Sequence, residues 1–467
     1  MKISEANVDL IQPGHDPIAI DAAIDAPLAN VPLAIYIHLP WCVRKCPYCD
    51  FNSHAADTFD EIAYVDALEA DLDAQLPDFW GRRPHAVFIG GGTPSRFSGN
   101  AIARILDLLR SRFVIAPNTE ITLEANPGAS DADAFAAYRE AGVNRLSIGV
   151  QSFDDQRLAA LGRIHRAADA IAAFAAARRA GFERINLDLM FALPARADEH
   201  PSAVQGLEHA LADLDTAISL GPEHISWYQL TIEPNTLFGT RPPQRPDDDA
   251  AAAIYCAGRR RLADAGYTRY EVSAYARRGE ACRHNLNYWR FGDYIGLGAG
   301  AHGKRSDPAS DRIVRTRKSR VPNAYMADPA RTLEHDIAAS DRLFEALLNG
   351  LRLVDGIERG HLIARTGSSA NDLDRMVAPL IDRDWLTWVD DLASTVSTSA
   401  SGAVRSTSAP TEIWSGDASR TATESAQDSK TAALSAHARL RATSEAYDHL
   451  DQILGALIPG EPNRRHV

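Results

Sequence analysis

Short apolar runs alternate with longer amphipathic segments from residue 33 to about residue 230. The short runs are rich in β-branched residues, which is typical of strands, and the longer segments repeat apolar residues at helical spacing. The predicted strands are Leu33–His38, His85–Ile89, Ile121–Ala125, Arg145–Gly149, Ile185–Met190 and His224–Leu230. The predicted helices between them are 60–76, 100–113, 131–141, 167–180 and 203–220. Such a series of β–α units predicts an α/β fold with a parallel sheet, either an open doubly wound sheet or a partial barrel.

The pattern changes after this region. A possible strand at 269–275 and an aromatic, glycine-rich stretch at 283–304 are followed by two amphipathic helices at 341–351 and 371–381 and a short strand at 385–388. Helices followed by a small strand suggest a winged-helix-like appendage. Serine, threonine and alanine then dominate, and such a composition buries too little apolar surface to offset the ordering entropy. We therefore expect five segments, and they are an N-terminal tail at 1–30, a core at 31–305, an appendage at 306–391, a disordered insertion at 392–440 and a terminal helix at 441–467.

Polar residues follow each predicted strand of the core. Examples are the loop Gly90–Pro94, the loop Glu124–Gly128 and the segment Gly149–Phe153. The carboxyl ends of parallel strands meet at one edge of a sheet or one mouth of a barrel. We expect these loops to line a common site.

Three of the five cysteines lie on one loop after the first strand, with the spacing C-x3-C-x2-C at Cys42, Cys46 and Cys49. Three thiolates can hold three irons of a cubane iron–sulfur cluster and leave the fourth iron open to an exchangeable ligand. A zinc site with His38 or His54 as a fourth ligand is an alternative, but the x3 spacing is unfavourable for it. Three neighbouring cysteines cannot all pair as disulfides. The loop thus predicts a [4Fe–4S] cluster.

Charge and composition narrow the classes of partner. The formal net charge of −13 argues against broad binding to nucleic acid, and the basic segment 312–320 is expected to be a solvated turn or hairpin. The chain shows neither a signal peptide at its start nor an apolar run of membrane-spanning length. Together with the sparse cysteines, these features favour a cytoplasmic protein.

The cysteine loop, followed one strand later by Gly90–Pro94, resembles the radical S-adenosylmethionine superfamily. Glycines in such a loop allow the backbone to approach a bound amino acid closely. Further segments are similar to the oxygen-independent coproporphyrinogen III oxidases and their relatives, over about residues 33–390. These segments are Tyr36–Cys42, Cys46–His54, Glu124–Pro127, Arg145–Phe153, Leu161–His165 and Asn186–Met190. The resemblance implies a partial (β/α)6 barrel and S-adenosylmethionine as a cofactor.

The same resemblance implies roles for individual residues. It makes Tyr36, Gly91 and Glu124 contacts to the cluster-bound S-adenosylmethionine. It also implies that five residues match positions that line a second cofactor site in the oxidase branch, and these are Gly92, Thr93, Gln151, Arg163 and Asp188. Tyr48 of the cysteine loop is expected to bind cofactor as well. An ordinary salt bridge at the barrel mouth would explain any one charged member of the set.

Two features point to a heme-chaperone branch of this family. The oxidases have a fourth cysteine two residues after the third, whereas this chain has Phe51. In addition, His284 begins an H-N-x-x-Y-W pattern that resembles the proposed heme-binding motif of that branch, although a lone histidine is more often an ordinary loop residue. Cys282 lies close by and could serve as an alternative or covalent heme anchor, although a half-buried free cysteine is the more ordinary interpretation. Cys256 is expected in the core. The loop Gly296–Gly303 is expected to be either a second backbone-approach loop or a tight packing element.

The resemblance implies a protein that binds heme, the cluster and S-adenosylmethionine and passes heme to an acceptor protein, such as a respiratory hemoprotein. An electron donor would reduce the cluster. The alternative is an enzyme that oxidatively decarboxylates coproporphyrinogen III to protoporphyrinogen IX, and retention of the cofactor-lining set favours it. The sequence therefore leaves two possibilities, a heme chaperone and an enzyme.

Overall fold

The computed structural model describes residues 28–128, 131–195, 200, 203–389, 434–444 and 446–457. Its main element is a twelve-stranded sheet with the spatial order β14-β13-β12-β11-β1-β4-β5-β6-β7-β8-β10-β9. Six consecutive parallel strands form its centre, and these are β1 (Leu33–Leu39), β4 (Pro84–Gly91), β5 (Glu120–Ala125), β6 (Arg145–Gln151), β7 (Arg184–Phe191) and β8 (His224–Gln229). All six strands were predicted from the apolar runs. Their parallel pairing in sequence order confirms the predicted partial (β/α)6 barrel.

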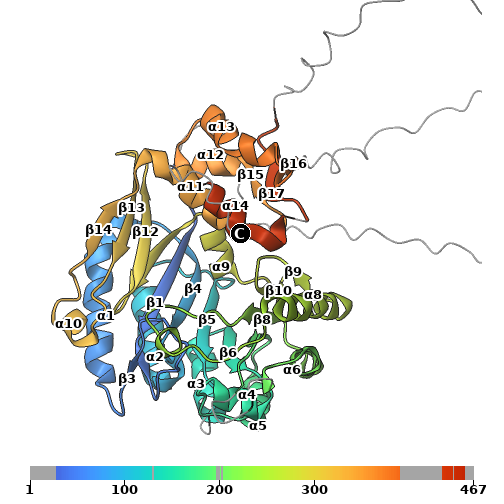
Figure 1. Cartoon of the computed structure of the whole chain (residues 1–467). Helices are drawn as coiled ribbons and strands as arrows, with labels where there is room; N and C mark the ends of the chain where they lie inside the picture. Colours follow the sequence, from blue (N-terminus) through green and yellow to red (C-terminus); the bar gives the residue numbers. More distant parts are fainter. Residues whose placement is uncertain are drawn as a thin grey trace, which may run out of the picture.

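Helices lie around the outside of this curved sheet (Figure 1). They are α1 (Glu61–Gln75), α2 (Gly99–Arg112), α3 (Asp131–Ala141), α4 (Asp155–Ala160), α5 (Ala167–Arg179), α6 (Leu207–Leu220) and α8 (Asp248–Asp264). Asp60 and Ser98 cap α1 and α2 by accepting hydrogen bonds from backbone N–H groups of the first turn. The predicted helix 203–220 starts only at Leu207, because Gly206 occupies the N-cap position.

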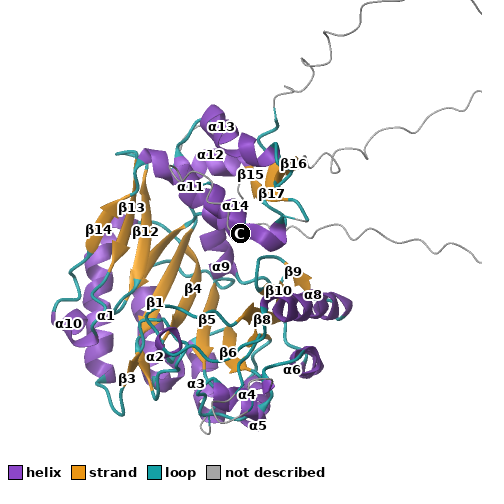
Figure 2. Cartoon of the chain, in the orientation of Figure 1, coloured by secondary structure: helices purple, strands orange, loops and turns teal. Residues whose placement is uncertain are grey.

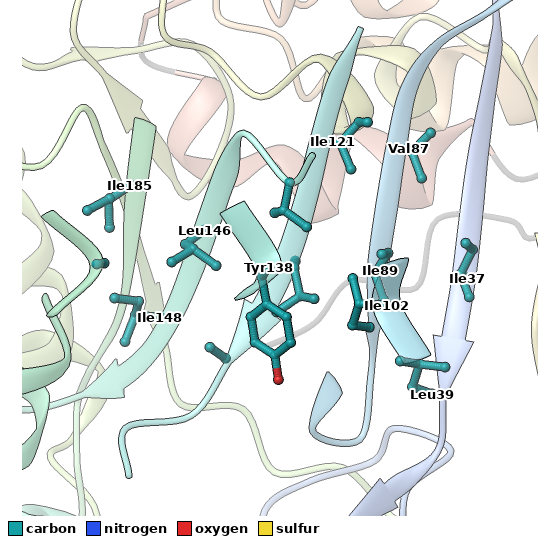
Figure 3. Close-up of a cluster of buried hydrophobic side chains, with 14 of the residues drawn as sticks. Ile37, Leu39, Val87, Ile89, Ile102, Ile121, Tyr138, Leu146, Ile148 and Ile185 are labelled. Carbon is teal, nitrogen blue, oxygen red and sulfur yellow. The ribbon is translucent and has the colours of Figure 1, made fainter. Parts of the chain in front are cut away.

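The main core lies between the sheet and these helices. Ile37 and Leu39 of β1 lie beside Ile89 of β4, and Ile102 of α2 belongs to the same buried cluster (Figure 3). The alternate residues of the same strands, Ala34 and Ala86, belong to a separate small cluster with Tyr294. Because successive side chains of a strand point to opposite faces, the small alanines mark the inner face of the barrel.

The inner face carries a helix that the sequence pattern did not predict. This helix, α9 (Arg283–Trp289), contacts β1 and β4 and also the appendage helix α11 (Ala339–Gly350). In Figure 1, α9 lies between the sheet and the appendage. It places the H-N-x-x-Y-W pattern inside the barrel rather than on an exposed loop.

Four strands extend the sheet beyond β1, and they are β11 (Asp293–Leu297), β12 (His302–Asp307), β13 (Arg312–Arg317) and β14 (Leu333–Asp336). β11 runs parallel to β1, and β12 to β14 are antiparallel. The basic segment 312–320 thus begins as one arm of a hairpin, as predicted. The expected boundary at residue 306 is wrong, because it falls within β12 and residues up to 336 hydrogen-bond into the large sheet. On the far side, the expected strand at 269–275 is two short strands, β9 (Thr268–Arg269) and β10 (Ala274–Ala276).

The appendage has its own apolar core. Besides α11 it contains the helices α12 (Arg359–Thr366), α13 (Ala370–Ile381) and α14 (Leu450–Ala456), and a sheet with the order β15 (Ile357–Glu358), β17 (Arg439–Ala442), β16 (Leu386–Val389) (Figure 2). Ile453 and Leu457 pack into this core, as expected for the terminal helix. The expected limit of the insertion at 440 is wrong, because Leu440 and Ala442 of β17 are buried. Residues 1–27 of the expected tail, 392–433 of the expected insertion and 458–467 lie outside the described residues.

Across the described parts of the chain, no helix combines the length and apolarity needed to cross a membrane.

Candidate functional site

A cavity of about 790 Å³ opens at the carboxyl ends of the parallel strands. Its lining includes most of the residues that the sequence assigned to cluster and cofactor. These are Cys42, Cys46, Tyr48, Cys49, Gly91, Gly92, Thr93, Glu124, Gln151, Arg163 and Asp188. The expectation that the loops after successive strands share one site is therefore confirmed. We call this space the cysteine cavity.

The cysteine loop is held at both sides. The short strand β2 (Trp41–Cys42) pairs with β3 (His54–Ala55), which closes the loop into a compact unit. The side-chain amide of Asn52 donates to the carbonyls of Ala299 and Arg320, each at 2.9 Å. These contacts fix the loop to the turn between β11 and β12 and to the segment that follows β13, each more than 240 residues away in sequence.

Each of the three sulfurs has a polar neighbour within hydrogen-bonding reach. The Thr93 hydroxyl donates to Cys42 Sγ at 3.4 Å, and the Arg163 guanidinium donates to Cys46 Sγ at 3.7 Å. The Ser53 hydroxyl lies 3.7 Å from Cys49 Sγ. Hydrogen bonds to cluster sulfurs are one of the means by which a protein sets a cluster's reduction potential.

Asn126 connects two of these donors. Its amide nitrogen donates to the Thr93 hydroxyl at 3.0 Å, and its oxygen accepts from Arg163 Nη2 at 2.7 Å. A continuous hydrogen-bonded path therefore runs from Cys42 through Thr93, Asn126 and Arg163 to Cys46. The sequence placed Thr93 and Arg163 in the site, but it assigned no role to Asn126.

This donor set fits a cubane cluster better than a zinc ion. Among the residues that the structure describes, no three His, Cys, Asp or Glu side chains converge on a single metal ion. A cubane does not require such convergence, because each thiolate binds a different iron. Burial raises the pKa of the Cys42 and Cys49 thiols above their ordinary value. Binding of iron therefore has to displace thiol protons.

The glycines after β4 allow the site to close against the cysteine loop. Gly91 has a φ of 122°, and a Cβ there would lie 2.9 Å from the His38 ring. A Cβ on Gly92 would lie 2.7 Å from the Pro40 carbonyl group. Side chains at these positions would push the loop after β4 away from the loop after β1, so the glycines serve packing between loops in addition to any approach by a ligand.

Two half-buried carboxyl groups, Glu124 and Asp188, line the cavity from β5 and β7. Burial, with the nearby Asp188 as a second cause, raises the pKa of the Glu124 carboxyl to about 8, although the Gly91 N–H donates to it at 3.1 Å. Burial also raises the pKa of Asp188, which accepts hydrogen bonds from Ser147 at 2.8 Å and Asn186 at 2.8 Å. A cationic ligand would favour ionisation of either carboxyl group.

Gln151 is held in an uncommon conformation at the end of β6. Its φ is 71°, in the left-handed region that few residues other than glycine adopt, and its side-chain oxygen accepts from the Tyr228 hydroxyl at 2.9 Å. Such strain is tolerated where the surrounding structure fixes the residue, and it frequently marks a functional site.

Two predicted residues lie outside the cysteine cavity. The His284 ring is 3% exposed and stacks on Phe88 with 4.7 Å between ring centroids, and its Nδ1 has no hydrogen-bond partner within the described structure. Its neighbours Asn285 and Trp289 do line the cavity. Tyr36 lines an adjoining cavity, and its hydroxyl hydrogen-bonds to His38 Nδ1 at 2.9 Å.

The adjoining cavity measures about 650 Å³ and lies between the barrel mouth and the hairpin of β12 and β13. It shares Phe51, Gly91 and Glu124 with the cysteine cavity. Its other contributors include His302 and Arg317, which sequence reasoning missed. The sequence offered two signals: the glycine-rich loop Gly296–Gly303, which contains His302, and the basic segment 312–320, which contains Arg317. Neither identified a side chain of the site. We call it the hairpin cavity.

The remaining cysteines are not part of either cavity. Cys282 is buried, and its Sγ lies 3.5 Å from a carboxylate oxygen of Glu120. Burial raises the pKa of its thiol to about 12. Cys256 was expected in the core, but it is exposed on α8, so that expectation is wrong.

Two family models match the chain. The Radical SAM superfamily model matches residues 36–205, and the HemN C-terminal domain model matches residues 337–391. The heme chaperone HemW of Escherichia coli is 50% identical over 357 residues, which span 76% of this chain and 92% of that relative. The heme chaperone HemW of Haemophilus influenzae is 46% identical over 360 residues, with 76% and 91% covered. The radical S-adenosyl methionine domain-containing protein 1 of Bos taurus is 36% identical over 342 residues, with 70% and 75% covered.

The structure resembles that of the coproporphyrinogen III oxidase HemN from Escherichia coli. The TM-score is 0.65 with 21% sequence identity, over 79% of this chain and 87% of that one. At this level of identity the likeness concerns the fold alone.

Proposed function

Since this chain belongs to the HemW family of radical S-adenosylmethionine proteins, we propose that it is a heme chaperone that receives heme and passes it to an acceptor protein. The observation that carries the proposal is the arrangement of the cysteine cavity beside the hairpin cavity. One holds the three thiols and the glycine loop, and the other offers aromatic and cationic side chains to a second ligand.

Membership of the superfamily implies a [4Fe–4S] cluster and S-adenosylmethionine, and the residues of the cysteine cavity suit both. Cys42, Cys46 and Cys49 would hold three irons, and Glu124 would bind the ammonium group of the cofactor. When bound, the cluster supplies one electron for cleavage of the cofactor's sulfonium bond. The chain's own part is to position the cofactor, to exclude water through the packed glycine loop and to donate hydrogen bonds to the cysteine sulfurs.

Phe51 separates this proposal from the alternative, oxidative decarboxylation of coproporphyrinogen III. The intact set of cofactor-lining residues favours the enzyme. Phe51 argues against the enzyme, because it occupies the position at which the oxidases have a fourth cysteine. Its side chain is 62% exposed and lines both cavities, so it adds apolar surface at the junction where a thiol would add a ligand.

The acceptor that we propose is a hemoprotein, such as a respiratory one, and the site of action that we propose is the cytoplasm. Reduction of the cluster requires an electron donor. The net charge of −13 favours protein partners over nucleic acid.

The test uses one anaerobically reconstituted sample for two measurements. We expect saturable binding in a heme titration, followed by transfer to a heme-free hemoprotein, and no protoporphyrinogen from coproporphyrinogen III in the presence of S-adenosylmethionine and a reductant. Formation of many protoporphyrinogen molecules per protein molecule would show that the protein is the enzyme and not the chaperone. A Phe51→Cys variant, assayed in parallel, tests whether the fourth thiol changes iron content or product.

A further inference from the structure

The hairpin cavity is a second ligand site that is physically continuous with the cysteine cavity. At about 650 Å³ it falls in the range of roughly 300–1,000 Å³ that is typical of small-molecule sites. Phe51, Gly91 and Glu124 line both spaces, so a ligand in one lies directly beside a ligand in the other.

The charge of the hairpin cavity is opposite to that of the whole protein. Arg317 is exposed and has no hydrogen bond or ion pair with any side chain in the described parts of the chain, and Arg320 contacts only Asn52 through a side-chain bond of 3.5 Å. The Lys318 ammonium is turned away, toward the buried Asp71. The one carboxyl group in the lining is Glu124, which the hairpin cavity shares with the cysteine cavity. Two arginines therefore face the hairpin cavity without an ion pair of their own among the described residues.

The rest of the lining is aromatic. Tyr36, Tyr288 and Tyr294 line one side, with Tyr288 and Tyr294 packed edge to face at 4.5 Å between ring centroids. Phe51 adds an exposed ring at the junction. Aromatic walls beside two cations suit a flat apolar ligand that carries two anionic groups.

One histidine of this cavity can reach a ligand. His302 is exposed at the start of β12 and lies directly opposite Arg317 in the register of β12 and β13. An imidazole nitrogen is a common ligand of heme iron, and His302 belongs to the lining of the cavity. His284, by contrast, is enclosed by Phe88, Tyr36 and Tyr288 and lines neither cavity.

We propose that heme binds in the hairpin cavity, with His302 as an axial ligand of the iron and Arg317 and Arg320 paired with the two propionates. This inference rests on the proposed function and specifies where its cargo sits. Heme in this position would lie against Phe51 and next to the cysteine cavity.

The experiment titrates the reconstituted holoprotein with ferric heme and, separately, with metal-free protoporphyrin IX. We expect His302→Ala to change the Soret band of the heme complex and to weaken heme binding by about tenfold or more, the equivalent of one strong contact. The same variant should bind protoporphyrin IX as the wild type does, since that ligand has no iron. The Arg317→Ala/Arg320→Ala double variant should weaken both ligands by about tenfold or more and should reduce the salt dependence of binding.

Matched controls lie on the same sheet. His335→Ala removes an exposed histidine of β14, and Arg312→Ala removes an exposed arginine of β13, and neither residue lines the cavity. Both controls should bind heme with wild-type affinity. If His302→Ala kept the wild-type spectrum and heme affinity while His284→Ala lost both, the iron ligand would be His284. That result would overturn this inference but leave the proposed function standing. Absence of heme binding by the wild type would overturn the proposed function as well.

Discussion

The cysteine cavity and the hairpin cavity adjoin each other but are built in different ways. The first lies at the ends of parallel strands, and its polar side chains are hydrogen-bonded to one another, as in the path through Thr93, Asn126 and Arg163. The second lies against an antiparallel hairpin, where His302 and Arg317 are exposed and make few contacts. A prearranged network suits a resident cofactor, whereas an open lining allows a ligand to enter and leave. Retention of a cofactor and exchange of a ligand can therefore be assigned to separate parts of one barrel mouth.

The largest expected effect is loss of the cluster from the cysteine cavity without a change in heme binding. Replacement of Cys42, Cys46 or Cys49 by alanine should abolish assembly of the cluster, because each thiolate binds its own iron. Iron and sulfide analysis after reconstitution measures this, and heme titration of the same variant should give an affinity within about twofold of the wild type. Cys256→Ser is the control, since that thiol is exposed on α8 and should leave the cluster intact. Equal loss of heme binding in the three variants would show that the cavities do not act separately.

A smaller effect concerns stability in acid. Burial, and then Arg163, lowers the pKa of His165 in the cysteine cavity to about 4, below its ordinary value of about 6.5. The unfolded chain therefore binds a proton that the folded chain excludes, so this stability is present above about pH 6.5 and is lost as the pH falls through about 4. The loss is on the order of 3 kcal/mol.

Denaturant unfolding between pH 7 and pH 4 checks this expectation. His165→Gln, which keeps a donor for the Val150 carbonyl, should lose less stability in acid than the wild type. His335→Gln, at an exposed histidine of β14, should follow the wild-type curve. Parallel curves for His165→Gln and the wild type would contradict the assignment.

The smallest expected effect tests the hydrogen-bonded path. Thr93→Val removes the donor to Cys42 while keeping the side-chain volume. Loss of one such bond should make the reduction potential of the cluster more negative, on the order of 40 mV for one electron. A redox titration followed by electron paramagnetic resonance measures the shift, and Thr93→Ser should retain the wild-type potential. An unchanged potential in Thr93→Val would mean that this bond does not tune the cluster.

The cysteine cavity could be predicted from sequence because its residues lie in short segments at the ends of regular strands. Strand and helix periodicity gave the order of the elements, and the placement of Cys42, Glu124 and Asp188 followed from the rule for parallel sheets. The role of Asn126 did not follow, since a hydrogen bond between side chains from different loops depends on their final separation.

The hairpin cavity could not be predicted in the same way. It depends on β11 pairing with β1 across about 260 residues, and no local pattern encodes such a pairing. The helix α9 was missed because its seven residues are too few to show a periodic apolar face. The burial of His284 could not be predicted for the same reason, because residues that enclose it come from β1 and β4.

The appendage sheet has a consequence for how this chain can vary in length. Val389, at the end of β16, lies opposite Arg439, at the start of β17, so the chain leaves the appendage and returns to it at neighbouring points. Closure of a loop between two adjacent points becomes only slowly more costly as residues are added. The sequence between Val389 and Ser435 can therefore be lengthened, shortened or exchanged while the pairing of β16 with β17 and the hydrogen bonds from the start of α12 to Ala436 and Ala438 are kept. The pair is a natural place to attach a label or a fused domain remote from the mouth of the barrel.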